Sequence, residues 1–458
     1  LAQIIGGIPM SQTEFVRPAD LQLEVEAQKL ADDGAVAWFL QNGRNGENHA
    51  LIVDALADNQ FAAIFENALL DDIRMQYQRF TDAKILPHAH QWHLDNALIP
   101  DDLIADLSAL GTFGVCIPEN FGGLGLDGLG VGKVAMCVIT EELSRGWIGA
   151  GSLGTRSEIA GDLILQNGSP AQKSHWLPKI ASGEVLPTAV FTEPDIGSDL
   201  GHLKSRAEKT ATGWRITGAK NWITHAARSD LMTLLARSDK DQRDHKGLSM
   251  FLVEKPRGSE ADPFPMQGMS GSEIEVLGYR GMREYALAFD GVEIGQDALL
   301  GNEEGQGFRQ LMRTFESARI QTAARAVGVA RRALELALDY ATNRTQFGTS
   351  IISFPRVSGK LVLMMAEIVA ARELTYFAAG EKDKGRRCDI EAGMAKLLAA
   401  RVAWSAADNA LQIHGGNGYA LEYEISRILC DARILNIFEG AGEIQAQVIT
   451  RGRLSERN

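Results

Sequence analysis

Apolar residues recur every three or four positions over much of this chain, which is the spacing of an amphipathic helix. Leu103, Leu107 and Leu110 follow this spacing within residues 76–186. From about residue 304 two longer stripes occur, made of Ile320, Ala324, Val327, Ala330, Leu334 and Leu338, and of Leu361, Met364, Met365 and Ile368. Stripes of this kind are typical of the packed face of a helix. Both regions are therefore expected to form helical bundles.

Between residues 187 and 298 the period shortens to two. The segment 214–217 alternates apolar with polar side chains, and the segment 285–289 alternates large with small ones. The Thr212-Gly213 pair supplies a turn. Alternation bounded by turns predicts the strands of a small antiparallel β domain.

This helical, β, helical order predicts a mainly α chain with a central β domain packed between two helical parts. The expected parts are an N-terminal helical extension, an N-terminal helical domain, a middle β domain and a C-terminal helical bundle, at residues 1–75, 76–186, 187–298 and 299–458.

Composition narrows the class of protein. The 458 residues carry a net charge of −13, which argues against a nucleic-acid binder or a binder of anionic membranes, and an anionic substrate would need a local basic patch. No run of about 18 apolar residues occurs, so no membrane span is expected. The four cysteines form no C-x-x-C pair and suit a reducing compartment such as the cytoplasm. The chain begins at Leu1 rather than Met, which leaves open a removed targeting segment.

Two local patterns have competing interpretations. Gly123–Gly128 matches the G-x-G-x-x-G of dinucleotide folds, but the strand signal before it is only Val115–Ile117 and no βαβ pattern surrounds it, so a flexible loop is favoured. His88, His90 and His93 could bind a metal, yet no Cys, Asp or Glu set completes a recognisable ligand spacing. We assign no metal site.

Four stretches could carry chemistry, and the first precedes the β domain. In Phe191–Asp199 the hydroxyls of Thr192 and Ser198 and the backbone amides could hydrogen-bond the edge of a flat heterocycle. A plain turn with a cap residue explains the same residues. Trp222 and Thr224 add an indole and another hydroxyl, although a lone Trp is usually core.

The second and third stretches lie in the C-terminal helical region. Arg344–Gly348 ends a long predicted helix, where its arginine could neutralise a pyrophosphate or serve as an ordinary helix C-terminus. Gln412–Tyr419 contains paired glycines, which let a backbone approach a ligand closely or simply stop a helix.

The fourth stretch, residues 427–445, contains Glu439 between Phe438 and Gly440. Apolar residues precede it, so the carboxyl could sit in a dry pocket. Desolvation would then raise its pKa toward the working range of a general base. A structural or surface carboxylate is the alternative.

Taken together and in this order, the four stretches resemble the acyl-CoA dehydrogenase family over roughly residues 80–455, and the segments T-E-P-x-x-G-S-D and D-A-x-I-x-x-I-x-E-G-x-x-E-I-Q are specific to it. The resemblance implies a helical N-terminal bundle, a middle β domain and a C-terminal four-helix bundle. FAD would lie between the last two, partly against a neighbouring subunit. A homo-oligomer, tetramer or dimer, would follow.

The same likeness implies residue roles. Glu439 matches the base position of the medium-chain type. Relatives with the base on the earlier helix carry it immediately before the arginine matched by Arg319, where this chain has Ala318. Cofactor contacts would come from Phe191, Thr192, Ser198, Trp222, Thr224, Arg344, Phe347, Gln412, Gly415 and Gly416. Substrate contacts would come from Ser198, Phe315, Glu316, Arg319, Phe438 and Gly440.

Three positions depart from the family pattern. Pro355 replaces a Gln common after the Phe-Gly segment, and Ala441 replaces the Thr usual two residues after the base. Arg283 stands where small hydroxyl residues are usual. These departures weaken particular FAD contacts, not the resemblance.

The implied reaction is α,β-desaturation of an acyl-CoA. Glu439 would take the α-proton while hydride leaves the β-carbon for flavin N5, and a backbone amide near Glu439 would help stabilise the thioester oxygen. Electrons would pass to an electron-transfer flavoprotein. An acyl-CoA oxidase on the same fold and a non-catalytic helical scaffold are the alternatives.

The N-terminal extension and the segments 281–285 and 438–443 are similar to the branch of the family that oxidises (2S)-methylsuccinyl-CoA to mesaconyl-CoA in the ethylmalonyl-CoA pathway. Such a dicarboxylyl substrate needs a cation for its free carboxylate. Arg156, on a helix expected to face the acyl group, is one candidate, and Arg283 is another; a surface or structural arginine is the alternative for Arg156. Short branched-chain, butyryl- and glutaryl-type esters stay open.

Overall fold

The computed structural model describes residues 8–9, 15–16, 24–42, 46–57 and 67–454. The described part of the N-terminal extension contains β1 (Ile8–Pro9), β2 (Phe15–Val16), α2 (Glu24–Asp32), α3 (Gly34–Asn42) and α4 (Gly46–Ala57). The two short strands pair antiparallel. α4 lies against α12 (Pro355–Asp383), and Leu56 near its end is fully buried. Residues 68–75 of the predicted extension belong to the start of α5 (Ala68–Lys84), so the expected boundary after residue 75 falls within a helix. Residues 1–7, 10–14, 17–23, 43–45 and 58–66 lie outside the described ranges.

The helices that follow are α5 (Ala68–Lys84), α6 (Leu86–Leu94), α7 (Asp101–Ala109), α8 (Gly132–Gly146), α9 (Ile148–Asn167) and α10 (Pro170–Ala181). α9 matters most for the site because every residue from Ile148 to Ile164 is buried. It packs against α8, α10 and α11 (Gly307–Asn343) and against the first strand of the sheet. Its polar side chains, Arg156 among them, therefore face protein groups rather than bulk water.

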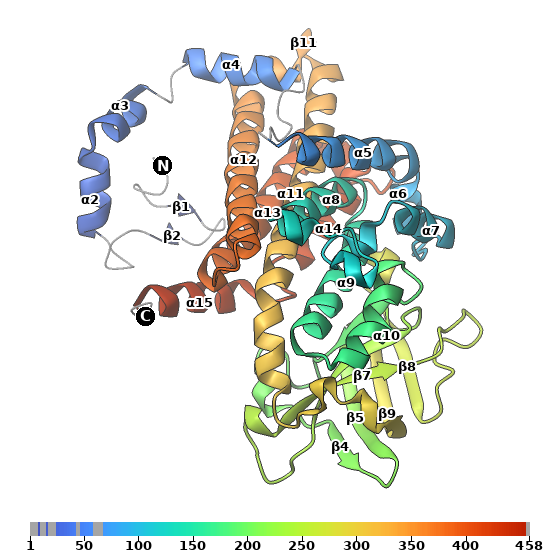
Figure 1. Ribbon diagram of the computed structural model, residues 1–458. Coiled ribbons are helices and arrows are strands. Elements are labelled where there is room, and N and C mark those ends of the chain that lie inside the picture. Colours follow the sequence, from blue (N-terminus) through green and yellow to red (C-terminus); the bar gives the residue numbers. More distant parts are fainter. Residues whose placement is uncertain (1–7, 10–14, 17–23, 43–45, 58–66, 455–458) are drawn as a thin grey trace.

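The middle of the chain folds into one seven-stranded sheet (Figure 1), with strands β3 (Pro187–Val190), β4 (Arg206–Lys209), β5 (Gly213–Thr224), β6 (Leu231–Arg237), β7 (Leu248–Glu254), β8 (Met269–Ile274) and β9 (Glu284–Gly295). β6 pairs parallel with β3 and β4, and the other pairs are antiparallel. The sheet is therefore mixed, whereas the sequence predicted an antiparallel one. The alternation was read on β5 and β9, which do pair antiparallel. β3 and β6 are separated by a long connection, and a long connection permits parallel pairing.

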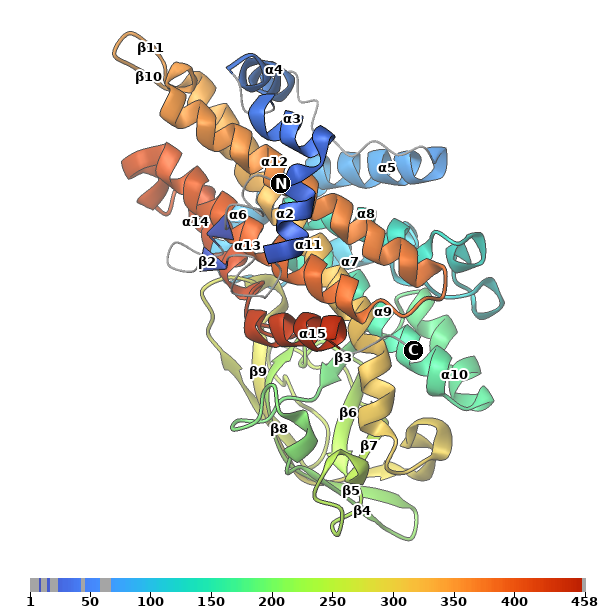
Figure 2. The ribbon, with the colours of Figure 1, turned by 90° about the vertical axis from the view of Figure 1, so that its left-hand side faces the viewer.

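The C-terminal part consists of α11, α12, α13 (Asp389–His414), α14 (Ile425–Ile434) and α15 (Gly442–Leu454). A small hairpin, β10 (Thr345–Gln346) with β11 (Thr349–Ser350), joins α11 to α12. The predicted stripe from Ile320 to Leu338 on α11 is buried throughout, because the helix packs against α8, α9, α12 and α13. Figures 1 and 2 show α11 running from the sheet through the helical body.

The predicted class, a mainly α chain with a central β domain, is thus confirmed. Gly123–Gly128 lies in a loop with short 3₁₀ turns and no preceding strand, as the loop interpretation requires. Within the described ranges, no helix is long and apolar enough to cross a membrane.

Candidate active site

Glu439 lies in the loop between α14 and α15, with its backbone in the left-handed region at φ 52°. Gly440 follows with φ 95°, and the fully buried Lys396 of α13 donates a hydrogen bond of 2.6 Å to the Gly440 carbonyl. A non-glycine residue in this region is strained unless its surroundings hold it there. The Lys396 contact anchors the turn, and the turn directs the Glu439 side chain onto α11.

On α11 the Glu439 carboxylate meets two donors through one oxygen. Arg325 Nη2 lies 2.5 Å from Oε2, and the Thr322 hydroxyl donates to the same atom. Arg156 Nη2 of α9 lies 3.4 Å from the other oxygen, Oε1. Arg325 is fully buried and the Glu439 side chain is 14% exposed. Thr322, Arg325, Glu439 and Arg156, together with Thr224 and Glu284 described below, are called the Glu439 cluster.

The pKa of Glu439 is shifted in the opposite direction to the one expected from the sequence. Burial raises the pKa of its carboxyl, but Arg325, Arg156, the Thr322 hydrogen bond and Lys396 together outweigh burial, and the net shift is downward. The prediction of a raised pKa was therefore wrong for the chain without ligand. Desolvation was foreseen, but the guanidinium groups that α9 and α11 bring to the carboxylate were not.

Arg156 connects Glu439 to the β domain. Its Nη2 lies 3.3 Å from Thr224 Oγ1 and 3.4 Å from the Tyr279 hydroxyl. The Nε atoms of Arg156 and Arg325 and Glu439 Oε1 are buried and form no hydrogen bond within the described part of the chain. Buried polar groups are normally hydrogen-bonded, so these atoms point to a ligand that completes them.

Glu284, the first residue of β9, is a second buried carboxyl in this place. Thr224 sits opposite it on β5, and the Thr224 hydroxyl lies 2.9 and 3.1 Å from the two Glu284 oxygens. Burial raises the pKa of Glu284 to about 8 against the opposing effects of Arg156 and Thr224. Arg283, the neighbouring candidate, instead pairs with Glu273 at 3.2 Å and donates to the Asn96 carbonyl.

Sequence reasoning missed Thr322, Arg325, Lys396 and Glu284. Arg325 does leave a signal, because it is a charge within an alanine-rich stretch of a helix predicted to be packed. Glu284 belongs to the segment 281–285, but within that segment only Arg283 was considered, as a cation for the substrate carboxylate. Neither position reveals its partner without the fold.

The β-domain residues form a second group, on the loop after β3 and on the end of β5. The backbone N–H of Asn221 donates to the Thr192 carbonyl at 2.9 Å, and Lys220 Nζ donates to the Phe191 carbonyl at 3.0 Å, so the predicted loop is tied to the strand. A register shift between Lys220 and Ile223 pushes Trp222 outward, with φ 59° and 54% exposure. Ser198 is also exposed. Thr224, in contrast, is buried in the Glu439 cluster.

A third group lies at the end of the helical part that points away from the sheet, and it is called the far end. Its members are Arg344, Phe347, Gln412, Gly415 and Gly416, all of them exposed. Tyr340 of α11 stacks on His414 of α13 with ring centroids 4.3 Å apart, which holds the two helix ends together. Figures 1 and 2 place the adjoining β10–β11 hairpin away from the sheet, so one chain does not bring the far end and Trp222 together.

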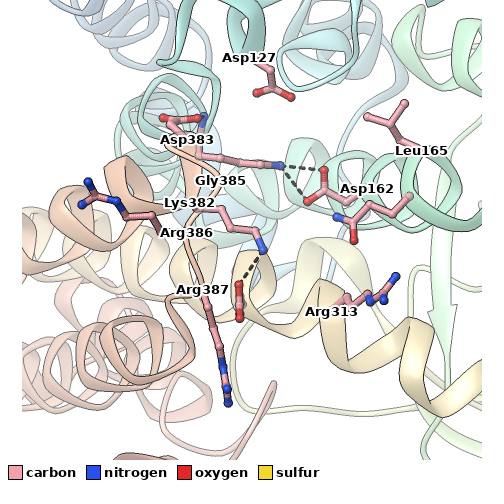
Figure 3. Close-up of a pocket in the computed structure, with 12 residues that line it drawn as sticks. Asp127, Asp162, Leu165, Arg313, Lys382, Asp383, Gly385, Arg386 and Arg387 are labelled. Atoms are coloured by element: carbon pink, nitrogen blue, oxygen red, sulfur yellow. Dashed lines mark hydrogen bonds and ion pairs between the residues drawn. The ribbon is translucent and has the colours of Figure 1, made fainter. Parts of the chain in front are cut away.

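Three of the expected substrate contacts, Phe315, Glu316 and Arg319, lie in the N-terminal third of α11. The Arg319 guanidinium stacks on the Phe315 ring at 5.8 Å, and Glu316 accepts a hydrogen bond of 2.6 Å from Lys382. Glu316 lines a cavity of about 510 Å³ between α9, α11 and the end of α12 (Figure 3). Four cations, called the rim cations, line the same cavity: Arg313, Lys382, Arg386 and Arg387.

The floor of this cavity is an internal ion cluster. Lys133 Nζ contacts Asp162 at 2.8 Å and Glu158 at 2.9 Å, and all three side chains are buried. Figure 3 shows Asp162 among the residues that line the cavity, with its carboxylate in an ion pair. The residues of the Glu439 cluster do not line it, so the cavity and the cluster are separate places along α9 and α11.

Comparison with known proteins gives matches along most of the chain. Three family models match: acyl-CoA dehydrogenase, N-terminal domain, at residues 69–184, middle domain at 188–292 and C-terminal domain at 305–454. The (2S)-methylsuccinyl-CoA dehydrogenase of Cereibacter sphaeroides is 60% identical over 456 residues, covering 98% of this chain and 81% of the relative.

Solved structures agree with this result. A glutaryl-coenzyme A dehydrogenase in complex with glutaryl-CoA matches with a TM-score of 0.80 and 32% identity, covering 86% of this chain and 97% of that one. The butyryl-CoA dehydrogenase of Megasphaera elsdenii matches with a TM-score of 0.80 and 30% identity, covering 86% and 100%.

Proposed function

Because the chain belongs to the acyl-CoA dehydrogenase family, we propose that it oxidises (2S)-methylsuccinyl-CoA to mesaconyl-CoA, with bound FAD as cofactor and Glu439 as the base. The reaction class is α,β-dehydrogenation of an acyl-CoA thioester. The Cereibacter sphaeroides relative supports the choice of substrate.

One observation carries the proposal: the carboxylate of Glu439 faces two guanidinium groups, those of Arg325 and Arg156. A base alone needs no second cation. A substrate with a free carboxylate does, because a buried carboxylate without a partner is strongly disfavoured. Arg156 is the cation we assign to the free carboxylate, since its contact with Glu439 is the longer of the two, 3.4 Å against 2.5 Å for Arg325.

The residues present fit a flavin. The exposed Trp222 offers a ring face, and the buried Asn221 Oδ1 beside it lacks a hydrogen-bond partner within the described residues. At Gly415 and Gly416 an added Cβ would meet nothing within 4 Å, which leaves room for close approach at the far end. We propose that the β domain of one chain and the far end of another hold the same FAD, so the active form is a homo-oligomer, dimer or tetramer.

The CoA moiety needs cations in a chain with a net charge of −13. The rim cations supply the local basic patch. Within the described ranges Arg313 forms no ion pair. The other three rim cations, Lys382, Arg386 and Arg387, each pair with one acidic side chain. We assign the CoA phosphates to this rim and the pantetheine chain to Phe315 and Arg319.

The chain's own residues account for the proton transfer. Two donors on Oε2 fix the plane of the Glu439 carboxylate and keep that oxygen occupied, so Oε1 is the atom that takes the α-proton. Phe438, whose ring lies 4.8 Å from the Arg325 guanidinium, and Gly440 border the base. Bound FAD would supply the acceptor for the β-hydride. Holding the thioester between base and acceptor is a positioning effect.

Two finer assignments follow the family. An electron-transfer flavoprotein is proposed as the acceptor of the electrons, and the cytoplasm as the location of this step of the ethylmalonyl-CoA pathway. Oxygen consumption by the enzyme without an acceptor protein would instead identify an oxidase.

The test is a panel of CoA thioesters added one at a time to the flavin-loaded enzyme, with bleaching of the visible flavin absorbance recorded. Methylsuccinyl-CoA should bleach the flavin at the lowest concentration, ahead of glutaryl-, butyryl- and isobutyryl-CoA. The variant Arg156→Gln should raise KM for methylsuccinyl-CoA by about 10–100-fold, the worth of about 1.5–3 kcal/mol for a charged hydrogen bond. An unchanged KM, or bleaching by butyryl-CoA alone, would contradict the assignment.

A further inference from the structure

Glu284 has no part in the proton transfer just described, yet it lies buried within the Glu439 cluster. We propose, resting on the proposed function, that Glu284 is a specificity-determining residue whose protonated carboxyl leaves the charge of Arg156 available to the second carboxylate of a dicarboxylyl thioester. Ionisation of Glu284 would remove the preference for dicarboxylyl thioesters.

The geometry around Glu284 is that of a neutral acid. Within the described ranges no cation forms an ion pair with it, and its hydrogen-bond partner is the Thr224 hydroxyl. Arg156 Nη2 donates to Thr224 Oγ1 on the other side, at 3.3 Å. The Thr224 hydroxyl therefore connects the Arg156 cation to the Glu284 acid. Burying an ionised carboxylate with only a hydroxyl partner is costly, so such a group keeps its proton.

Glu439 is the opposite case within the same few residues. It faces Arg325 at 2.5 Å and Arg156 at 3.4 Å, and its pKa is lowered. The pKa of Glu284 is raised to about 8, first by burial and also by the charge of Glu439. Two carboxyls in one site are thus pushed in opposite directions, which separates their protonation states at neutral pH.

The charges that face Glu284 come from each element packed around it. They are Arg156 of α9, Glu439 of the loop before α15 and, behind Glu439, Arg325 of α11. His225, which follows Thr224, is buried and its pKa is lowered to about 3, so it stays neutral. With Glu284 protonated, Arg156 and Arg325 face one anion. With Glu284 ionised, they face two.

With Glu439 ionised and Glu284 protonated, the two arginines give the cluster one excess positive charge at neutral pH. A second substrate carboxylate neutralises that charge, whereas a methyl group in its place does not. A dicarboxylyl thioester is therefore preferred over a monocarboxylyl thioester of the same shape as long as Glu284 holds its proton.

The pH dependence has a definite sign. As the pH rises through about 8, Glu284 ionises and competes for Arg156. KM for methylsuccinyl-CoA should then rise by up to about tenfold per pH unit. KM for 2-methylbutyryl-CoA, in which a methyl group replaces the carboxylate, should not rise.

The experiment uses the flavin-loaded enzyme, its Glu284→Gln variant and Glu273→Gln as a matched control. Glu273 pairs with Arg283 outside the cluster. Both thioesters are assayed from pH 6.5 to 9.5. The wild type and Glu273→Gln should show the rise for methylsuccinyl-CoA, and Glu284→Gln should keep a low KM throughout, because glutamine mimics the protonated acid. Lys396, whose pKa is lowered to about 8, titrates in the same range, and a rise that persists in Glu284→Gln overturns the proposal.

A readout independent of activity covers a variant that does not fold. The infrared carbonyl band of a protonated carboxylic acid should be present in the wild type at pH 7 and be lost as the pH rises through about 8, apart from the earlier loss due to Glu158, whose pKa burial raises to about 7. Its absence at pH 7 would overturn the proposal. If the wild type does not oxidise methylsuccinyl-CoA at all, the proposed function fails; if it does, but KM stays flat with pH, only the role of Glu284 fails.

Discussion

Arg325 is fully buried beside Glu439, whereas Phe347 at the far end is 96% exposed. The Glu439 cluster is assembled from two helices, two strands and one loop of one chain, and its charges are mostly matched inside that chain. The far end is equally rich in expected contacts, yet its side chains meet few groups of their own chain. In the proposed arrangement, proton removal is prepared within one subunit, while cofactor retention depends on a second one.

The largest effect should come from the base. Glu439→Gln keeps the shape of the cluster and removes the proton acceptor, so kcat should fall about 10²–10⁴-fold, the range for a general base. Bound flavin should remain, because the far end is untouched. The measurement is single-turnover flavin bleaching with the flavin content recorded. An active variant would end the assignment of Glu439.

The next effect tests the charges around the base. Arg325 lowers the pKa of Glu439, so Arg325→Gln should raise it and move the acidic limb of the kcat/KM profile to higher pH. Stability should change as well. A lowered folded-state pKa contributes stability above the unfolded pKa, and this contribution is lost as the pH falls through the folded value. Removing one partner of a buried pair costs about 3–5 kcal/mol, which urea unfolding measures.

Arg331→Gln is the matched control for this experiment. Arg331 lies on the same helix, is also buried, and pairs with Glu142 at 2.6 Å and with Glu141 at 2.8 Å. It should destabilise the protein by a similar amount and leave the pH profile in place. A profile that shifts in both variants would mean that the cluster responds to general loosening rather than to the charge of Arg325.

The far end should respond differently. Arg344→Gln should weaken FAD retention about 10–100-fold, the worth of a charged hydrogen bond of about 1.5–3 kcal/mol. The thermal stability of the flavin-free chain should not change, because Arg344 is exposed. Dialysis followed by a flavin assay measures the loss. Arg356→Gln removes another exposed arginine from the same end and should retain FAD. An equal loss of FAD in both variants would mean that the effect comes from the change in net charge and not from a contact of Arg344.

The same contrast explains what the sequence could predict. The stripe on α11 and the alternation in β5 and β9 depend on local periodicity, so the fold class followed from them. Glu439 and Arg156 were placed by resemblance, and both lie in the cluster. Arg325 and Glu284 were missed because a buried charge has meaning only beside its partner, and the partners here are 114 and 60 residues away. The parallel pairing of β3 with β6 is equally non-local.

The smallest effect separates two explanations of the paired glycines. Gly415 has φ 60° and ψ −136°, a conformation that only glycine adopts readily, so Gly415→Ala should cost about 1–3 kcal/mol of stability in the flavin-free chain. Gly416 has no positive φ, and an added Cβ there meets nothing within 4 Å, so Gly416→Ala should leave the melting temperature unchanged. If the glycines merely stop α13, Gly416→Ala will also retain FAD. If they admit a cofactor from a neighbouring subunit, it will lose FAD several-fold while the fold stays intact, since a methyl group would then occupy space that is open only in the single chain. Flavin content and melting temperature, measured on the same samples, decide between the two.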